Sequence, residues 1–164
     1  MISSNGLLVE QTKIVTAIAP CTPSTTTPDY VSLKGYHKLA VIVTVDNGST
    51  VTGSAITLKQ ASAVANTGEK ALAFTKVWKN EDTANSDALT ETTVSSNTFT
   101  TVSTNSLNSI YVMEVNPSDL DVANGFDCVR LGTGDAANMV LSGVYVLWPA
   151  KYKASTPVPS AIVD

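Results

Sequence analysis

Short apolar or alternating segments, separated by polar turns, recur along the whole chain and indicate many short β-strands. The longest apolar run, YHKLAVIVTV (36–45), is rich in β-branched residues and predicts a strand covered on both faces. The turn DNGS (46–49) follows, and Asn-Gly favours a hairpin because both residues adopt positive φ readily. Residues 51–59 then alternate, with a change of phase near Gly53 that indicates a β-bulge. We therefore expect a β-hairpin across 36–59.

The same kind of pattern predicts further strands elsewhere and almost no amphipathic helix. Residues 116–125 favour a single helical turn, with Asn116 as its cap and Pro117 at its first position. About eight strands at short spacing predict an all-β, antiparallel β-sandwich of jelly-roll type. An immunoglobulin-like sandwich is the rival, but its Cys–Trp–Cys spacing is absent. The further strands are expected over 7–19, 71–79, 109–115, 126–132 and 139–152, with one or two within 89–105. The core is expected to include Leu39, Val41, Val43, Phe74, Tyr111, Val129, Leu141 and Val146.

The length of 164 residues predicts one β-sandwich domain over 1–164, large enough to fold without metal or disulfide. Residues 1–30 are expected to form an N-terminal strand or arm and a loop rich in proline and threonine, PCTPSTTTPD. Residues 153–164 are expected to form a C-terminal tail that is extended and exposed, or docked onto a neighbouring molecule. Both proline-containing terminal regions are therefore candidate arms.

The composition narrows the classes of partner. The chain is 43% hydrophobic but only 15% charged, and its net charge is −4. No block of Lys and Arg is present, so we expect neither nucleic acid nor an anionic membrane as a partner. No stretch approaches the ~20 apolar residues that span a bilayer, and the N-terminus lacks the basic region of a signal peptide. Cys21 and Cys128 lack zinc or redox spacing; Cys128 is expected to be a buried thiol, and a disulfide between the two stays open.

No constellation of residues points to catalysis, a cofactor or a metal, so a non-enzymatic protein is expected. His37 is the only histidine, and no GxSxG motif accompanies it. The segment GTGD (132–135) lacks the third glycine of a phosphate-binding loop and is interpreted as a turn. Acidic residues within 81–91 and 119–127 are interpreted as solvated carboxylates, with a chance cation site as the alternative. A carboxylate pair for glycoside hydrolysis stays open, because such pairs depend on spacing in three dimensions.

Trp78 and Trp148 each fall late in an apolar strand. They could be ligand platforms, but packing in the core or between subunits is the expected role. The low aromatic content of 6% argues against a sugar-binding cleft lined with stacking rings.

Several segments of the chain occur in the same order in a known group of proteins. They are GSTVTGSAITLKQASAVANTGEKALAFTKVWKNEDT, LTETTVSSNTFTT, SIYVMEVNPSDLDVANGFDCVRLGTGDAANMVLSGVYVLWPAKY and PSAIVD. Over about residues 30–164 the chain resembles small structural proteins encoded near the major capsid protein of tailed bacteriophages and prophages. The resemblance is a pattern of strands and turns and carries no catalytic residues. Where an Arg-Tyr pair is common in such proteins, this chain has Lys151-Tyr152.

The resemblance implies a virion protein of the capsid decoration, or cement, type. Such a protein binds the outer surface of the head, bridges capsomers and forms small homo-oligomers, here a dimer or a trimer, after synthesis in the host cytoplasm. Its expected partners are the major capsid protein and further copies of itself. A tail or baseplate component and a carbohydrate-binding jelly-roll module are the alternatives. The candidate partner-contact residues are Pro20, Pro23, Pro28, Trp148, Pro157, Pro159 and Ile162.

Overall fold

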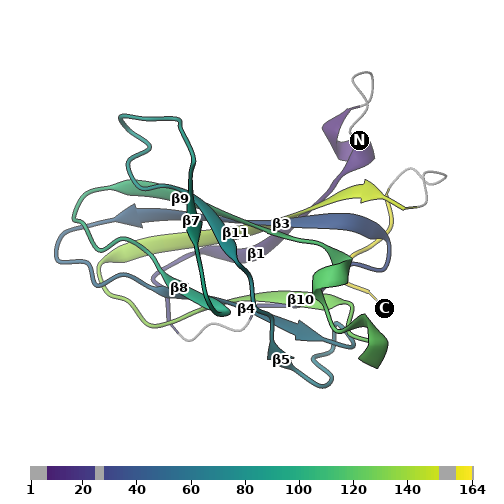
Figure 1. Cartoon of the computed structure of the whole chain (residues 1–164). Coiled ribbons are helices and arrows are strands. Elements are labelled where there is room, and N and C mark those ends of the chain that lie inside the picture. The colour runs from purple at the N-terminus through teal and green to yellow at the C-terminus, as the bar shows by residue number, and fades with distance from the viewer. Residues whose placement is uncertain (1–6, 25–27, 152–157, 164) are drawn as a thin grey trace.

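Two antiparallel β-sheets pack face to face in the computed structural model, which describes residues 7–24, 28–151 and 158–163 (Figure 1). The first sheet has six strands, in the spatial order β1 (Lys13–Cys21), β11 (Met139–Ala150), β3 (Tyr36–Asn47), β9 (Asn108–Val115), β6 (Lys76–Asn80) and β7 (Thr90–Thr93). The second has β2 (Val31–Ser32), β10 (Cys128–Thr133), β4 (Ala55–Ala61) and β5 (Lys70–Ala71), and β8 (Thr98–Thr100) also pairs with β4.

The strand order identifies the fold as a jelly roll. The chain crosses repeatedly from one sheet to the other, so that β1, β3, β9 and β11 lie in the first sheet and β2, β4 and β10 in the second. Each sheet is therefore assembled from strands distant in sequence, as in a double-sheet jelly roll. The β6–β7 pair extends the first sheet beyond β9. The prediction of an all-β antiparallel sandwich of jelly-roll type is confirmed.

Three short helices occur among the described residues. They are α1 (Leu8–Gln11) and the 3-10 turns η1 (Pro117–Asp119) and η2 (Val122–Asn124). The turn expected after residue 116 is confirmed: Pro117 stands at its first position, and the N–H of Asn116 donates to the Asp119 carboxylate at 2.7 Å. Within the described part of the chain, no helix is long and apolar enough to cross a bilayer.

Both sheets contribute to one hydrophobic core. Seven of the eight predicted core residues are buried, including Leu39, Val41 and Val43 of β3. Val146 is the exception, because Tyr145 and Leu147 point inward and the alternation of β11 turns Val146 to the opposite side of the sheet. The Tyr145 hydroxyl accepts a hydrogen bond from the N–H of Leu131 at 2.7 Å, so this side chain ties the first sheet to the second.

The predicted hairpin across 36–59 is wrong. Strand β3 pairs with β11 and β9, whereas β4 pairs with β10, β5 and β8, so residues 48–54 cross from one sheet to the other. Both edges of β3 are occupied by other strands, and its apolar inner side faces the second sheet across the core. Gly53 lies in the crossing with φ +71° and does not form a bulge within a strand.

The strand predicted over 71–79 is also divided between the sheets. Strand β5 ends at Ala71 in the second sheet, and β6 begins at Lys76 in the first. Leu72 and Phe74 are buried in the crossing, and Val77 is buried from β6. The phase of burial therefore changes at the crossing, and Trp78 points away from the core.

The C-terminal tail packs against its own domain. Ala161 is fully buried, and its carbonyl accepts a hydrogen bond from the N–H of Ser32 at 2.7 Å. The Tyr36 hydroxyl donates to the carbonyl of Pro159. The expectation of an exposed tail is therefore wrong for Val158 and Ala161, because an edge strand and a buried hydroxyl both need acceptors that this segment supplies.

Candidate binding surface

The solvent-facing side of the first sheet, called the outer face below, carries a contiguous set of apolar side chains. Val144, Ile42, Val112 and Trp78 are neighbours in register across β11, β3, β9 and β6. Facing positions in a sheet share one side, so these four side chains form a row across the strands. A second row runs from Ile14 through Val146 to Ala40.

Exposed apolar side chains concentrate on this side of the molecule. Ile14, Trp78 and Val140 of the outer face are 49%, 40% and 45% exposed. Ten large hydrophobic residues are exposed in the described part of the chain, and only Val122, Ile162 and Val163 lie elsewhere. The other seven lie on the outer face or on the two segments beside it: Leu7, Leu8, Val9, Ile14, Trp78, Leu89 and Val140.

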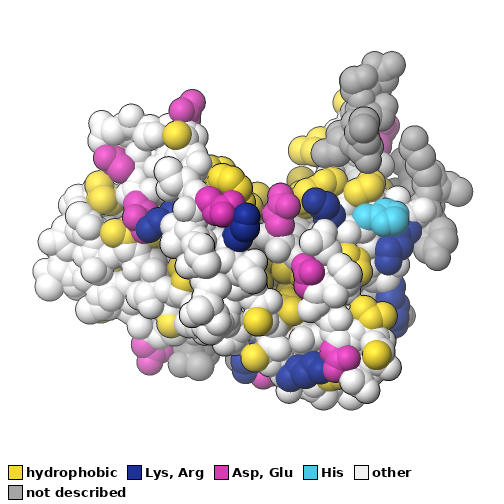
Figure 2. Space-filling model, viewed as in Figure 1, with side chains coloured by type: hydrophobic (Ala, Val, Ile, Leu, Met, Phe, Trp, Pro, Cys, Tyr) yellow, Lys and Arg dark blue, Asp and Glu magenta, His cyan; other side chains and the backbone are white. Residues whose placement is uncertain are grey.

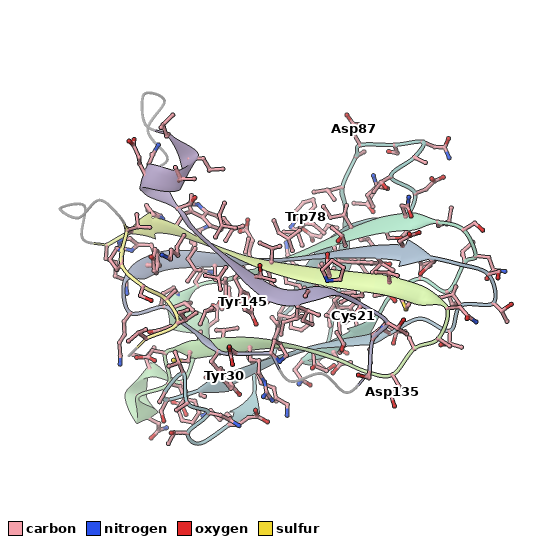
Figure 3. The ribbon with its side chains drawn as sticks, turned by 180° about the vertical axis from the view of Figure 1, so that it is seen from behind. Cys21, Tyr30, Trp78, Asp87, Asp135 and Tyr145 are labelled. Carbon is pink, nitrogen blue, oxygen red and sulfur yellow. The ribbon has the colours of Figure 1, made fainter. Side chains whose placement is uncertain are left out.

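Two projections rise beside the outer face (Figure 1), and the space-filling view is hollowed between them (Figure 2). One is the N-terminal segment 7–11, called the hook below, whose Leu7, Leu8 and Val9 are exposed. Two local hydrogen bonds stabilise the hook. The Leu7 N–H donates to the Glu10 carboxylate at 3.1 Å, and the Thr12 hydroxyl donates to the Leu8 carbonyl at 2.8 Å. The other projection is the loop 81–89 between β6 and β7, with Asp87 at its tip (Figure 3).

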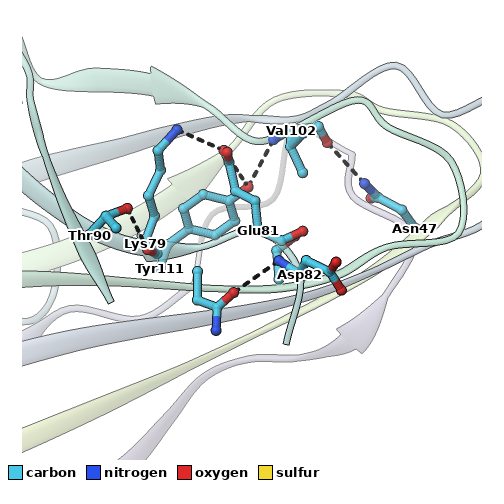
Figure 4. A network of polar contacts seen from close by, with 9 residues as sticks. Asn47, Lys79, Glu81, Asp82, Thr90, Val102 and Tyr111 are labelled. Carbon is cyan, nitrogen blue, oxygen red and sulfur yellow. Dashed lines mark hydrogen bonds and ion pairs between the residues drawn. The ribbon is translucent and has the colours of Figure 1, made fainter. Parts of the chain in front are cut away.

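A polar network anchors the loop 81–89 to the body (Figure 4). The Glu81 carboxylate accepts from the ammonium of Lys79 at 3.0 Å and from the Tyr111 hydroxyl at 3.5 Å. The same hydroxyl accepts from the N–H of Val102 at 2.9 Å, and the Asn47 amide donates to the Val102 carbonyl at 3.0 Å. Burial raises the pKa of Tyr111, so this hydroxyl stays protonated and serves as both donor and acceptor.

Two ion pairs lie on the outer face, which also carries the exposed carboxylate of Asp46 on β3. Lys38 of β3 lies 3.7 Å from Glu114 of β9, and Lys76 of β6 lies 3.0 Å from Glu91 of β7. Each pair joins adjacent strands and cancels its own charge. The outer face therefore combines an apolar centre with a border of two ion pairs and one further carboxylate, that of Asp46.

Two grooves open at the borders of the outer face. The larger, of about 470 Å³, lies beside Trp78 and Phe74, with Lys76, Glu114 and Asp119 among its polar lining residues. The smaller, of about 430 Å³, lies over Thr44, Ile110, Val140 and Ser142 and extends to Pro20. Both combine apolar and polar lining, and the larger one places an indole ring next to carboxylates and an amide.

A second polar cluster lies over the second sheet and has a structural role. The Glu69 carboxylate accepts from Lys59, Arg130 and Tyr30, and the Arg130 guanidinium lies 5.0 Å from the centre of the Tyr30 ring. Burial opposes ionisation of Glu69, but hydrogen bonds from Lys59 and Tyr30 and the charge of Arg130 outweigh it and lower the pKa of Glu69. Burial and the bond to Glu69 raise the pKa of Tyr30. These contacts join β4, β10 and the loop before β5.

The acidic residues flagged in the sequence are divided among separate partners. Glu81, Glu91, Asp121 and Asp127 pair with four different lysines, Lys79, Lys76, Lys70 and Lys34. Among the residues the structure describes, no group of three or more His, Cys, Asp or Glu side chains could hold a metal ion. The segment GTGD (132–135) ends β10 and turns, with the Gly134 N–H donating to the carbonyl of Ala55 at 2.7 Å.

The single histidine and the two cysteines lie apart from one another. His37 is exposed at the start of β3. Cys128 is fully buried, as expected, and no disulfide joins it to the half-buried Cys21. Figure 3 shows Cys21 near the end of β1 and Tyr145 of β11 between the two sheets.

The predicted contact residues are scattered over the molecule. Pro20 and Ile162 are exposed, whereas Pro28, Trp148 and Pro159 are half-buried. Pro23 is buried, and its carbonyl accepts a hydrogen bond from the N–H of Ala136 at 3.1 Å, so this part of the proline-rich loop is held by its own domain. Pro157 lies outside the described residues. Of this set, Pro20 and Trp148 border the outer face, and their role in partner contact stays a prediction.

The outer face was not predicted from the sequence as a binding surface, although the apolar pattern of residues 36–45 indicates one. The apolar run 36–45 predicts a strand covered on both faces, and within the described chain only the inner side of β3 is covered. Trp78 was expected to pack in a core or between subunits, and the core alternative is wrong because the ring is exposed. A strand that is apolar on both sides but covered on one is an indication of a missing partner.

Comparison with known proteins gives one distant structural neighbour. No protein-family model matches the chain, and no curated protein matches it. The crystal structure of the SPBc2 prophage-derived protein YomS is similar to this chain with a TM-score of 0.45 and 14% sequence identity, over 82% of this chain and 92% of that one. A structural neighbour of this chain is thus a prophage-derived protein. At this level of similarity the likeness carries no argument about fold or function, and the jelly-roll assignment depends on the strand order.

Proposed function

We propose that this chain is a non-enzymatic capsid decoration protein of a tailed bacteriophage. It would bind the outer surface of the head, bridge capsomers and so stabilise the shell. The observation that carries the proposal is that the described residues leave two separate apolar surfaces exposed on one sandwich, the outer face with its hook and the pair Ile162 and Val163. An exposed apolar patch of this kind is typical of a protein-binding surface. The sequence resemblance to structural proteins encoded near the major capsid protein supports the choice of partner.

A decoration protein needs contacts with the shell and contacts between its own copies. The described residues offer two separate sets of exposed apolar side chains, the outer face with its hook and a smaller set formed by Ile162 and Val163. We assign shell contact to the C-terminal end, where the segment 158–161 is fixed to the domain and holds the exposed pair in place. Anchoring reduces the entropy lost on binding.

The experiment is to add purified protein to expanded empty heads that lack it. Saturable binding at a fixed number of copies per capsomer, at symmetric positions in an image reconstruction, is the expected result. The double variant I162E/V163E should bind more weakly, whereas V122E, which alters an exposed residue elsewhere, should bind normally. The proposal is overturned if the wild-type protein does not bind heads, and labelling of whole virions that marks only the tail would favour the tail or baseplate alternative.

The larger groove favours a second candidate function, a carbohydrate-binding module. Its exposed Trp78 ring lies beside Lys76, Glu114 and Asn116, and an aromatic platform with polar neighbours suits a sugar ring. A glycan array tests this candidate, and W78S should abolish any signal. An array without a hit, together with no release of reducing sugar from polysaccharides, would eliminate it.

A further inference from the structure

The outer face has the properties of a surface that binds another copy of this chain. Its apolar rows extend across five strands, from Ile14 on β1 to Trp78 on β6. Five strands about 4.8 Å apart and about 25 Å long cover roughly 600 Å². This is the area of the whole outer face, including polar positions such as Thr44 and Asp46, and the apolar rows cover part of it. With the hook added, the area approaches the ~800 Å² that each partner buries in a stable complex.

The shape of this side is self-complementary. It holds both a projecting apolar element, the hook with Leu7, Leu8 and Val9, and the hollowed apolar surface beside it (Figure 2). A symmetric interface brings the same surface of two copies together, so a projection on one copy can occupy the hollow of the other. In the described part of the chain, the three apolar side chains of the hook are 54–66% exposed.

The charges favour a second copy over a partner of opposite charge. The pairs Lys38–Glu114 and Lys76–Glu91 each cancel their own charge at the border of the outer face. Two copies of an acidic protein would repel through unpaired carboxylates, and here Glu114 and Glu91 are matched by lysines, whereas Asp46, beside Val140, has no ion pair among the described residues. A basic partner would therefore gain attraction from one carboxylate only.

We propose that the outer face is the surface through which copies of this chain associate, with the hook of one copy seated on the outer face of another. This proposal names the surface through which the capsid decoration protein of the proposed function would contact its own copies. Its biological role rests on that proposed function, but the association itself does not. It can be tested on the isolated protein, without phage heads. Loss of self-association and loss of capsid binding are therefore separate results.

Sedimentation of the full chain over a range up to ~100 µM tests the proposal. The wild-type protein should show a mass at least twice that of the 17.1 kDa chain. I14E and W78S, at opposite ends of the rows, should weaken association by roughly tenfold or more, because each alters an exposed side chain within the proposed interface. Both positions are exposed, so far-ultraviolet circular dichroism and the thermal midpoint of the monomer should confirm that the variants fold.

The matched control is V122E, which places the same charge at an exposed valine of η2 on the other side of the molecule. It should leave association unchanged. The proposal is overturned if the wild-type protein remains monomeric at the highest concentration, or if V122E disrupts the oligomer as strongly as I14E does.

A photoreactive residue at position 8 tests the seating of the hook. Light and isotopically heavy chains are mixed, so that a cross-link between the two masses must join different copies. Cross-linked peptides from β1, β3, β9 or β11 would support the proposal. Cross-links between copies that reach only the second sheet would overturn it.

Discussion

Gly53 shows how one residue determines the path of the chain between the sheets. Its φ is +71°, and a Cβ at this position would lie 2.6 Å from the backbone carbonyl oxygen of Thr101. The N–H of Ser54 donates to the Thr101 hydroxyl at 2.9 Å and the N–H of Thr101 to the Ser54 carbonyl, so neither backbone can move away freely. The crossing from β3 to β4 therefore requires glycine.

We expect G53A to destabilise the protein by more than the cost of positive φ alone, which is about 1–2 kcal/mol for a residue with a Cβ. The control is G125A, because Gly125 also has positive φ, +79°, but a Cβ there would meet no atom within 4 Å. Urea unfolding of both variants measures the difference. Equal losses of unfolding free energy would show that the contact with Thr101 is relieved by local movement.

Glu69 makes stability depend on pH. Its lowered pKa means that the native protein binds fewer protons than the unfolded chain between that value and the ordinary carboxyl pKa of about 4.3. The stability from Glu69 is thus fully present above about pH 5 and is lost as the pH falls through the lowered native pKa. We expect E69Q to reduce the free energy of unfolding at pH 7 by about 1–3 kcal/mol, because Arg130 and Lys59 lose a charged acceptor.

The same variant should also weaken the dependence of stability on pH below about 5. Urea unfolding at a series of pH values measures this slope. D87N, at the exposed tip of the loop 81–89, is the matched control and should leave the slope near that of the wild-type protein. An E69Q slope equal to that of the wild type would contradict the assignment.

Among the elements, the C-terminal segment contributes more to the fold than its sequence suggests. Val158 and Ala161 are buried, and the carbonyls of Pro159 and Ala161 accept hydrogen bonds from Tyr36 and Ser32. A short apolar and proline-rich tail is typical of an extended arm, and the sequence offers no signal for which neighbours it meets. Its acceptors are used by groups more than a hundred residues earlier in the chain.

We expect deletion of 158–164 to lower the free energy of unfolding by about 2–5 kcal/mol. The deletion exposes apolar surface and leaves the Tyr36 hydroxyl and the Ser32 N–H without their acceptors. Deletion of 162–164 alone removes the exposed Ile162 and Val163 together with the last residue and should change stability little. The thermal midpoints of both truncated proteins measure this difference. Equal midpoints would contradict a structural role for residues 158–161 and would favour an arm that does not contribute to the fold.

The strands themselves were largely predictable, and their pairing was not. Alternation located β3, β9, β10 and β11 well, because burial on one side of a sheet imposes a period of two. The turn 46–49 has the composition of a hairpin but forms a crossing between sheets. Local turn preferences are weak compared with the pairing and burial of a whole strand, and in this fold both edges of β3 pair with strands from distant parts of the sequence.

On the scale of the whole molecule, the outer face depends on which side of each strand the sandwich covers. The proposed association links stability to concentration, because a partner that binds only the folded state stabilises it by mass action. We expect the thermal midpoint of the wild-type protein to rise with protein concentration, whereas the midpoint of I14E should rise less over the same range. Differential scanning calorimetry over roughly a hundredfold range of concentration measures this. A constant midpoint for the wild type would contradict self-association in that range.

The sequence by itself determined the class of fold, the position of most strands and the low charge of the surface, since these depend on composition and on local periodicity. Only the tertiary structure decided that the chain crosses between sheets at 48–54 and 72–75, that the tail returns to the core, and that Val146 and Trp78 face outward. The physical reason is that an alternating pattern distinguishes the two sides of a strand but does not determine which side packs against the opposite sheet. That choice is made by strands brought together from distant parts of the chain.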